Sequence, residues 1–125
     1  MSGNENSLFV LDTNIILYFL GGRLADSLPL GQYFVSIISE IELLSYSRLS
    51  AIEENEIRLF LAQLTVVGIE QNIKNLTIEL RKQHRLRLPD AVIVATTKPL
   101  SATLLTNDVG LTNIAELEAQ SMPLL

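Results

Sequence analysis

Four acidic residues stand where predicted strands and helices meet, and carboxylates placed in this way can hold a divalent cation. Asp12 and Asp108 each follow a short apolar run that predicts a buried strand. Glu42 and Asp90 each lie near the start of a predicted helix. In a parallel α/β sheet, strand carboxyl ends and most helix N-termini share one edge, where such folds place their sites. Because the chain has no cysteine and one histidine, its oxygen ligands favour Mg²⁺ or Mn²⁺ over Zn²⁺, and Mg²⁺ held by carboxylates serves phosphate chemistry.

Each acid also has a purely structural explanation. Asp12 is a favoured helix N-cap residue, and Glu42 could complete a capping box begun by Ser39. Asp90 would complement a helix dipole, and Asp108 could be a turn residue. A cluster of all four is harder to explain, because two carboxylates about 4 Å apart repel by about 4 kcal/mol at an effective dielectric constant near 20. A helix dipole offsets only about 0.3–1 kcal/mol, so the cluster needs protons or a divalent cation.

Short apolar runs alternate with amphipathic helices along the chain, after an expected loose tail over residues 1–7. The predicted strands cover residues 8–11, 33–38, 65–69 and 103–106, with a last one near 122–125. The predicted helices follow the first strand to about residue 20 and then cover 39–47, 53–64, 71–85 and 89–97. This alternation predicts a single α/β domain over residues 1–125, a three-layer sandwich with a parallel sheet of about five strands.

The length, composition and charge of the chain indicate which classes of protein it can belong to. A chain of 125 residues fits one domain with one core. No apolar run reaches the roughly 18–20 residues that span a membrane, and the polar N-terminus lacks the basic region of a signal peptide. We therefore expect a cytoplasmic protein with no membrane partner, which the absence of cysteine fits. The net charge of −5 argues against a broad electrostatic surface for nucleic acid.

One basic segment stands out against this acidic background. Four of the nine lysines and arginines lie shortly before Asp90, namely Arg81, Lys82, Arg85 and Arg87. They fit a solvated helix C-terminus, where the helix dipole favours cations. They also fit a surface that holds RNA phosphates beside the acids. The sequence leaves both interpretations open.

The four acid-bearing segments resemble, in their order, the four motifs of the PIN domain. They are Leu11-Asp12-Thr13-Asn14, Ser39-Glu40-Ile41-Glu42-Leu43, Leu88-Pro89-Asp90-Ala91-Val92-Ile93-Val94-Ala95 and Thr106-Asn107-Asp108. The resemblance covers nearly the whole chain and is greatest to the small VapC-type toxins, which are ribonucleases paired with an antitoxin. It implies a Mg²⁺- or Mn²⁺-dependent RNA endonuclease whose acidic quartet is Asp12, Glu42, Asp90 and Asp108. Asn14 and Thr106 would be its supporting polar residues.

In the site that the resemblance implies, the acids have different roles. Asp12 and Asp90 are the principal metal ligands, and Glu42 is a ligand or the general base. Asp108 holds a second metal or only an outer-shell water. A bound metal lowers the pKa of water and stabilises charge on the scissile phosphate. The choice between one metal and two stays open.

The resemblance also implies protein partners, namely a second copy of the chain and an antitoxin. Residues 46–64 and Tyr18–Leu20 are the expected interface segments, because apolar surface that stays exposed on a small domain usually contacts a partner. An antitoxin segment could insert an Arg or Lys against the acids in place of the cation. For Phe19 and Phe60 we favour burial in the core.

Two other functions are weighed against this one. A catalytically weak PIN-like binding module would keep the fold without the cleavage, although the complete quartet argues against lost activity. The segment Asp12-Thr13-Asn14 also resembles the first motif of haloacid dehalogenase phosphatases, with Asp12 as the nucleophile. That family's second Asp is replaced by Asn14, and the chain is short for it, so the match is weak.

Overall fold

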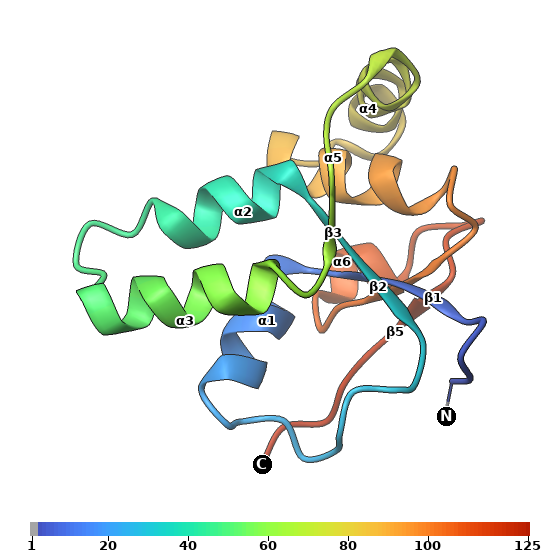
Figure 1. The fold of residues 1–125 in the computed structure, drawn as a ribbon. Helices are drawn as coiled ribbons and strands as arrows, with labels where there is room; N and C mark the ends of the chain where they lie inside the picture. Colours follow the sequence, from blue (N-terminus) through green and yellow to red (C-terminus); the bar gives the residue numbers. More distant parts are fainter. Residues whose placement is uncertain (1–2) are drawn as a thin grey trace.

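The computed structural model describes residues 3–125 as five short strands and six helices (Figure 1). The strands are β1 (Leu8–Leu11), β2 (Gln32–Ser36), β3 (Thr65–Val67), β4 (Thr103–Leu105) and β5 (Ala119–Gln120). The helices are α1 (Thr13–Leu20), α2 (Ile37–Leu44), α3 (Ala51–Leu61), α4 (Gln71–His84), α5 (Leu88–Thr97) and α6 (Val109–Thr112). All strand pairs are parallel, in the order β3-β2-β1-β4-β5. The predicted α/β fold with a five-stranded parallel sheet is confirmed.

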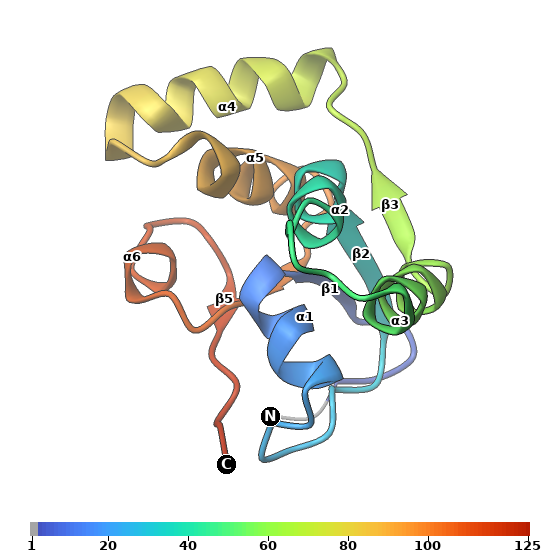
Figure 2. The ribbon, with the colours of Figure 1, turned by 90° about the vertical axis from the view of Figure 1, so that its left-hand side faces the viewer.

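Helices cover both faces of the sheet, so the central strand is buried on both sides. Figure 2 shows α4 and α5 on one side and α1 on the other. Val10 of β1 packs in the core cluster that includes α4 and α5, whereas its neighbours Phe9 and Leu11 pack in the cluster that includes α1 and α3. Such burial on two faces explains why β1 is a continuous apolar run instead of an alternating one.

The helix α5 is the most buried helix of the domain. All seven residues from Ala91 to Thr97 are buried, which confirms the helix predicted from Pro89 onward. Its hydroxyl side chains remain satisfied, because Thr96 donates to Val92 O and Thr97 to Ile93 O. Asp90 lies in the first turn of this helix, where its negative charge complements the helix dipole.

The start of α2 differs from the prediction. The strand β2 ends at Ser36, and the Ser36 hydroxyl accepts a hydrogen bond from Ile38 N at 3.1 Å, so the N-cap of α2 lies three residues earlier than the expected Ser39. The capping box of Ser39 and Glu42 is therefore wrong. Ile37 and Ile38 look like strand residues by their β-branched side chains, but a serine cap before them starts the helix. Ser39 and Glu42 consequently lie inside α2.

The C-terminal strand also differs from the prediction. It is β5 at Ala119–Gln120, whereas a strand near 122–125 was expected. The later residues run on beside the loop after α1, where Leu124 forms an isolated antiparallel bridge with Leu24 and Pro123 O accepts from Ala25 N. Met122 is buried among the residues of the α1 side, so its apolar character reflects core packing.

Two further expectations concern the tail and the aromatic residues. Of the expected tail, residues 1–2 lie outside the described part of the chain, and Ser7 N donates to Asn4 O in a turn. Phe19 was expected in the core but is 40% exposed. It packs against the partly buried Phe60 with the ring centroids 5.2 Å apart and the ring planes tilted by 37°, and this contact joins α1 to α3 at the surface. Among residues 3–125, no helix has the length and apolar character needed to cross a membrane.

Candidate active site

All four acids border one small cavity at the carboxyl edge of the sheet. The cavity has a volume of about 210 Å³ and is lined by Asp12, Thr13, Asn14, Glu42, Tyr46, Arg87, Asp90 and Asp108. Asp12 is the N-cap of α1 and Asp108 the N-cap of α6, so both directly follow a strand or its extension. Asp90 lies in the first turn of α5. The fold thus brings together residues that are up to 96 positions apart in sequence.

Asp12 is the most buried of the four acids, with 7% of its surface exposed. Its Oδ1 accepts from Thr13 N at 2.8 Å, and its Oδ2 accepts from the Thr106 hydroxyl at 2.6 Å. Burial raises the pKa of Asp12, these two hydrogen bonds lower it, and the charges of Asp90 and Asp108 raise it further, with a net increase. A raised pKa means that the ionised carboxylate is held at a free-energy cost in the absence of a cation.

Thr106 connects Asp12 to Asp108. Its hydroxyl accepts a hydrogen bond from Asp108 N at 3.1 Å while it donates to Asp12. Asp108 in turn accepts from Gly110 N at 2.8 Å through Oδ1, which fixes its side chain at the start of α6. Asn107 anchors the same loop, because its amide exchanges two hydrogen bonds with the backbone of Met122. Thr106 therefore supports two acids at once.

Glu42 is held by the hydroxyl of Thr13, which in turn contacts the hydroxyl of Ser39. Thr13 Oγ1 lies 2.7 Å from Glu42 Oε1 and 2.8 Å from Ser39 Oγ. A carboxylate can only accept and a hydroxyl has one proton, so Thr13 donates to Glu42 and the contact with Ser39 is made by the serine's proton. Thr13 thus fixes Glu42 through its side chain and Asp12 through its backbone. The sequence signal for Thr13 was its position directly after Asp12.

Asp90 is paired with Arg87, the one basic residue among residues 3–125 that lines the cavity. Arg87 Nε lies 3.1 Å from Asp90 Oδ2. Both the hydrogen bond to Asp90 and its charge raise the pKa of Arg87, with smaller contributions from Glu42 and Asp108. The other members of the predicted basic cluster, Arg81, Lys82 and Arg85, line a separate cavity of about 500 Å³ with Ile78 and Leu86. The structure therefore separates Arg87 from the other three basic residues.

The donor set of the cavity fits a hard divalent cation. The lining holds four carboxyl groups, the guanidinium of Arg87 and the phenol of Tyr46, and carboxylate oxygens are the ligands that Mg²⁺ and Mn²⁺ prefer. Within the described residues, no three acidic or histidine side chains come close enough to form a ligand set by themselves. Mg²⁺ characteristically binds through one or two carboxylates and keeps several waters. The residues present therefore fit the cation, with water completing its shell.

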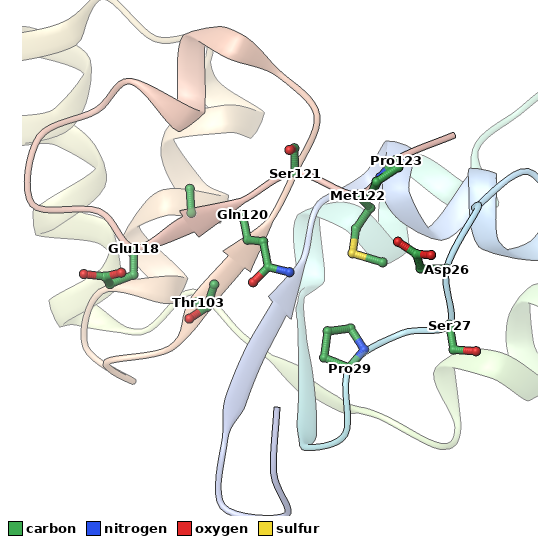
Figure 3. A pocket seen from close by; sticks show the side chains of 10 residues that line it. Asp26, Ser27, Pro29, Thr103, Glu118, Gln120, Ser121, Met122 and Pro123 are labelled. Carbon is green, nitrogen blue, oxygen red and sulfur yellow. The ribbon is translucent and has the colours of Figure 1, made fainter. Parts of the chain in front are cut away.

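A larger cavity lies away from these acids and has different chemistry. It has a volume of about 460 Å³ and lies between the loop after α1 and the strands β4 and β5. Figure 3 shows Thr103 and Gln120 on one side of it and Pro29 and Met122 on the other. Gln120 Oε1 is buried there without a hydrogen-bond partner among the described residues. None of the four acids lines this cavity, so we place the candidate active site in the smaller one.

The comparisons with known proteins agree with this fold. A family model of the PIN domain matches residues 9–117. No curated protein matches the chain. A solved structure of VapBC2 from Rickettsia felis, bound to a DNA fragment from its promoter, is similar with a TM-score of 0.75 and 20% identity, covering 93% of this chain and 99% of that one.

Two more solved structures are similar over nearly their whole length. A toxin–antitoxin complex from Klebsiella pneumoniae has a TM-score of 0.74 and 27% identity, covering 92% of this chain and 96% of that one. VapBC-1 from nontypeable Haemophilus influenzae has a TM-score of 0.73 and 25% identity, covering 91% and 97%. Because the family model spans residues 9–117 and the observed sheet matches these folds, the chain belongs to the PIN domain family.

Proposed function

We propose that this protein is a metal-dependent endoribonuclease and the toxin of a toxin–antitoxin pair. The observation that carries the proposal is the convergence of four carboxylates on one cavity at the carboxyl edge of a PIN-domain sheet. The toxin–antitoxin complexes among the structural neighbours support the second half of it. The phosphatase alternative loses support, because its weak motif match lies in a chain that belongs to another family.

Each acid of the cavity has a role in the proposed reaction. A bound Mg²⁺ or Mn²⁺ would supply a water of lowered pKa and would offset charge on the scissile phosphate. Asp12 and Asp90 would hold the cation, with Asp12 oriented by its two hydrogen bonds. Glu42, held by Thr13, would accept the proton of the attacking water as general base. Asp108 would orient water at the outer shell or hold a second cation.

The RNA itself needs cations on the protein surface. Arg87 borders the acid cavity, where its guanidinium could donate to the phosphate next to the cleaved bond. Arg81, Lys82 and Arg85 line their own cavity near the end of α4 and would contact phosphates farther along the strand. We expect the affinity for RNA to fall as the salt concentration rises, as it does for phosphate contacts generally.

Substitution of the acids tests the proposed reaction. Asp12→Asn and Asp90→Asn should each abolish Mg²⁺- or Mn²⁺-dependent cleavage of an RNA substrate, because an amide keeps the shape of the side chain and removes the ligand charge. Asp26→Asn is the matched control, since Asp26 lines the larger cavity, and it should cleave like the unaltered protein. Retained cleavage by both site variants would refute the assignment. RNA binding without cleavage by the unaltered protein would favour the binding-module alternative.

We also propose an antitoxin partner, a homodimer and a cytoplasmic location. A mainly apolar cavity of about 330 Å³ between α1 and the start of α3 supports the antitoxin, because an amphipathic helix can bind such a groove. Its apolar lining comes from Leu17, Leu20, Leu49 and Ile57. Copurification of a small protein from the native host tests the antitoxin. Light scattering at tens of micromolar tests the dimer, and a monomeric mass would refute it.

A further inference from the structure

The guanidinium of Arg87 already neutralises part of the acid cavity. Among the described residues, Arg87 is the single Lys or Arg in the lining of that cavity. Its Nε is 3.1 Å from Asp90 Oδ2, and the two side chains are 79% and 14% exposed. The pair therefore joins a carboxylate that is largely covered to a cation that is largely in solvent. The cation can leave without breaking any core packing.

The position of Arg87 in the chain explains this geometry. The left-handed backbone of Arg85, with φ of 54°, ends α4 and turns the chain toward α5. Arg87 is the N-cap of α5 but makes no side-chain cap hydrogen bond. Its side chain instead reaches Asp90, three residues later. The side chains of Arg87 and Asp90 make no hydrogen bond to each other's backbone. Their contact is therefore an ion pair beside the cavity and not a helix cap.

The charges around Arg87 come from the acids of the site. Arg87 lines the same cavity as Glu42 and Asp108, and the charges of both, in addition to that of Asp90, raise the pKa of its guanidinium. A guanidinium stays charged at every pH at which proteins fold. Arg87 is therefore a permanent positive charge at a place where a divalent cation has to bind.

We propose that Arg87 is the internal counter-ion of the cavity, and that a divalent cation must displace its guanidinium from Asp90 in order to bind. This inference rests on the proposed metal-dependent function. The two cations repel each other when both approach the same carboxylate. Because exposed ion pairs are weak, the displacement is easily reached at ordinary metal concentrations. The released guanidinium is then free to donate to an RNA phosphate at the mouth of the cavity.

Other roles for Arg87 predict a different effect on metal affinity. If Arg87 held Asp90 in the orientation that binds metal, removal of the guanidinium would weaken metal binding. If the pair were only a surface contact at a helix end, removal would change nothing. Of the three roles, only that of a competing counter-ion predicts that removal of the guanidinium tightens metal binding. The sign of the change therefore distinguishes the three roles.

Calorimetric titration of Mn²⁺ into the metal-free protein tests the inference without RNA. Arg87→Gln should bind Mn²⁺ about two- to fivefold more tightly than the unaltered protein, as expected for the loss of one exposed ion pair. Arg85→Gln is the control. It removes the same charge only two positions earlier in the chain, but from a side chain that lines a different cavity. Its affinity for Mn²⁺ should stay close to that of the unaltered protein.

Each other outcome overturns the inference. Weaker or unchanged binding by Arg87→Gln would do so, and equal tightening by Arg85→Gln would show a general effect of net charge instead. Absence of Mn²⁺ binding in all three proteins would overturn the metal-dependent function as well. Failure of the inference alone is thus recognised by measurable Mn²⁺ binding with the wrong order of affinities.

Discussion

Thr106→Val should destabilise the metal-free protein through the two acids that Thr106 supports. Thr106 is fully buried, donates to Asp12 Oδ2 at 2.6 Å and accepts from Asp108 N at 3.1 Å. Valine keeps the volume and removes both hydrogen bonds. A bond to a charged group contributes about 1.5–3 kcal/mol and an unpaired backbone donor costs about 1 kcal/mol more. We expect a loss of about 2–4 kcal/mol at neutral pH, a fall in Tm of about 10 °C.

The size of this loss should depend on pH, with a sign set by Asp12. Because the folded-state pKa of Asp12 is raised above 3.8, Asp12 contributes stability below pH 3.8 that is lost as the pH rises through the folded-state pKa. The Thr106 hydrogen bond lowers that pKa, so valine raises it further. The difference in unfolding free energy between the two proteins should therefore grow as the pH rises.

A double-mutant cycle isolates the charged hydrogen bond. In an Asp12→Asn background, Thr106→Val removes only a neutral hydrogen bond and should cost about 1 kcal/mol less than in the unaltered protein. Thr97→Val is the control, because Thr97 is equally buried and donates to the backbone carbonyl of Ile93, at the end of α5 opposite to Asp90. Its cost should not depend on pH. Chemical denaturation measures the unfolding free energy of the four proteins of the cycle and of the Thr97→Val control. Equal costs in both backgrounds, or a loss below about 0.5 kcal/mol, would refute the reasoning.

Two further predictions concern the charge of the site and the start of α2. Asp12→Asn should raise the Tm of the metal-free protein at neutral pH and leave it unchanged at about pH 3, where Asp12 is protonated in both folded and unfolded states; a lower Tm at neutral pH would mean that Asp12 is chiefly a helix cap. Ser36→Ala should cost about 1 kcal/mol, because it removes the N-cap of α2, and thermal unfolding followed by circular dichroism would detect it. If α2 instead began at Ser39, Ser36→Ala would be close to neutral.

The sequence predicted the sheet well wherever a strand is buried on both faces. The run Leu8–Leu11 is apolar throughout because β1 contacts both core clusters, and apolar runs of this kind are visible without a structure. The strand β5 carries no such signal. It has two residues, Ala119 and Gln120, and is defined by pairing with β4. Glu118 O and Gln120 O accept from the backbone of β4 and Thr106, contacts that only the folded chain creates.

The acids of the candidate site could be predicted from the sequence, but not every side chain that holds them by hydrogen bonds could. Asp12, Asp90 and Asp108 lie at the start of a helix, and helix starts are marked by local sequence, whereas Glu42 lies inside α2. The hydroxyl that holds Glu42 belongs to Thr13, which is 29 positions away, so no local pattern shows it. The basic cluster was divided for a similar reason. The left-handed conformation of Arg85 turns the chain, and this places Arg87 at the acids while Arg85 lines another cavity.

The cavity stores electrostatic free energy that the rest of the fold must offset. Asp12 is buried and repelled by Asp90 and Asp108, and its hydrogen bonds only partly compensate. The two core clusters on either side of β1 supply the stability that makes such a site tolerable. If Asp12→Asn abolishes cleavage while it raises the Tm, the charge that is needed for function is the same charge that strains the fold. Arg87 offsets part of the charge of Asp90 from outside the core, where a cation can replace it.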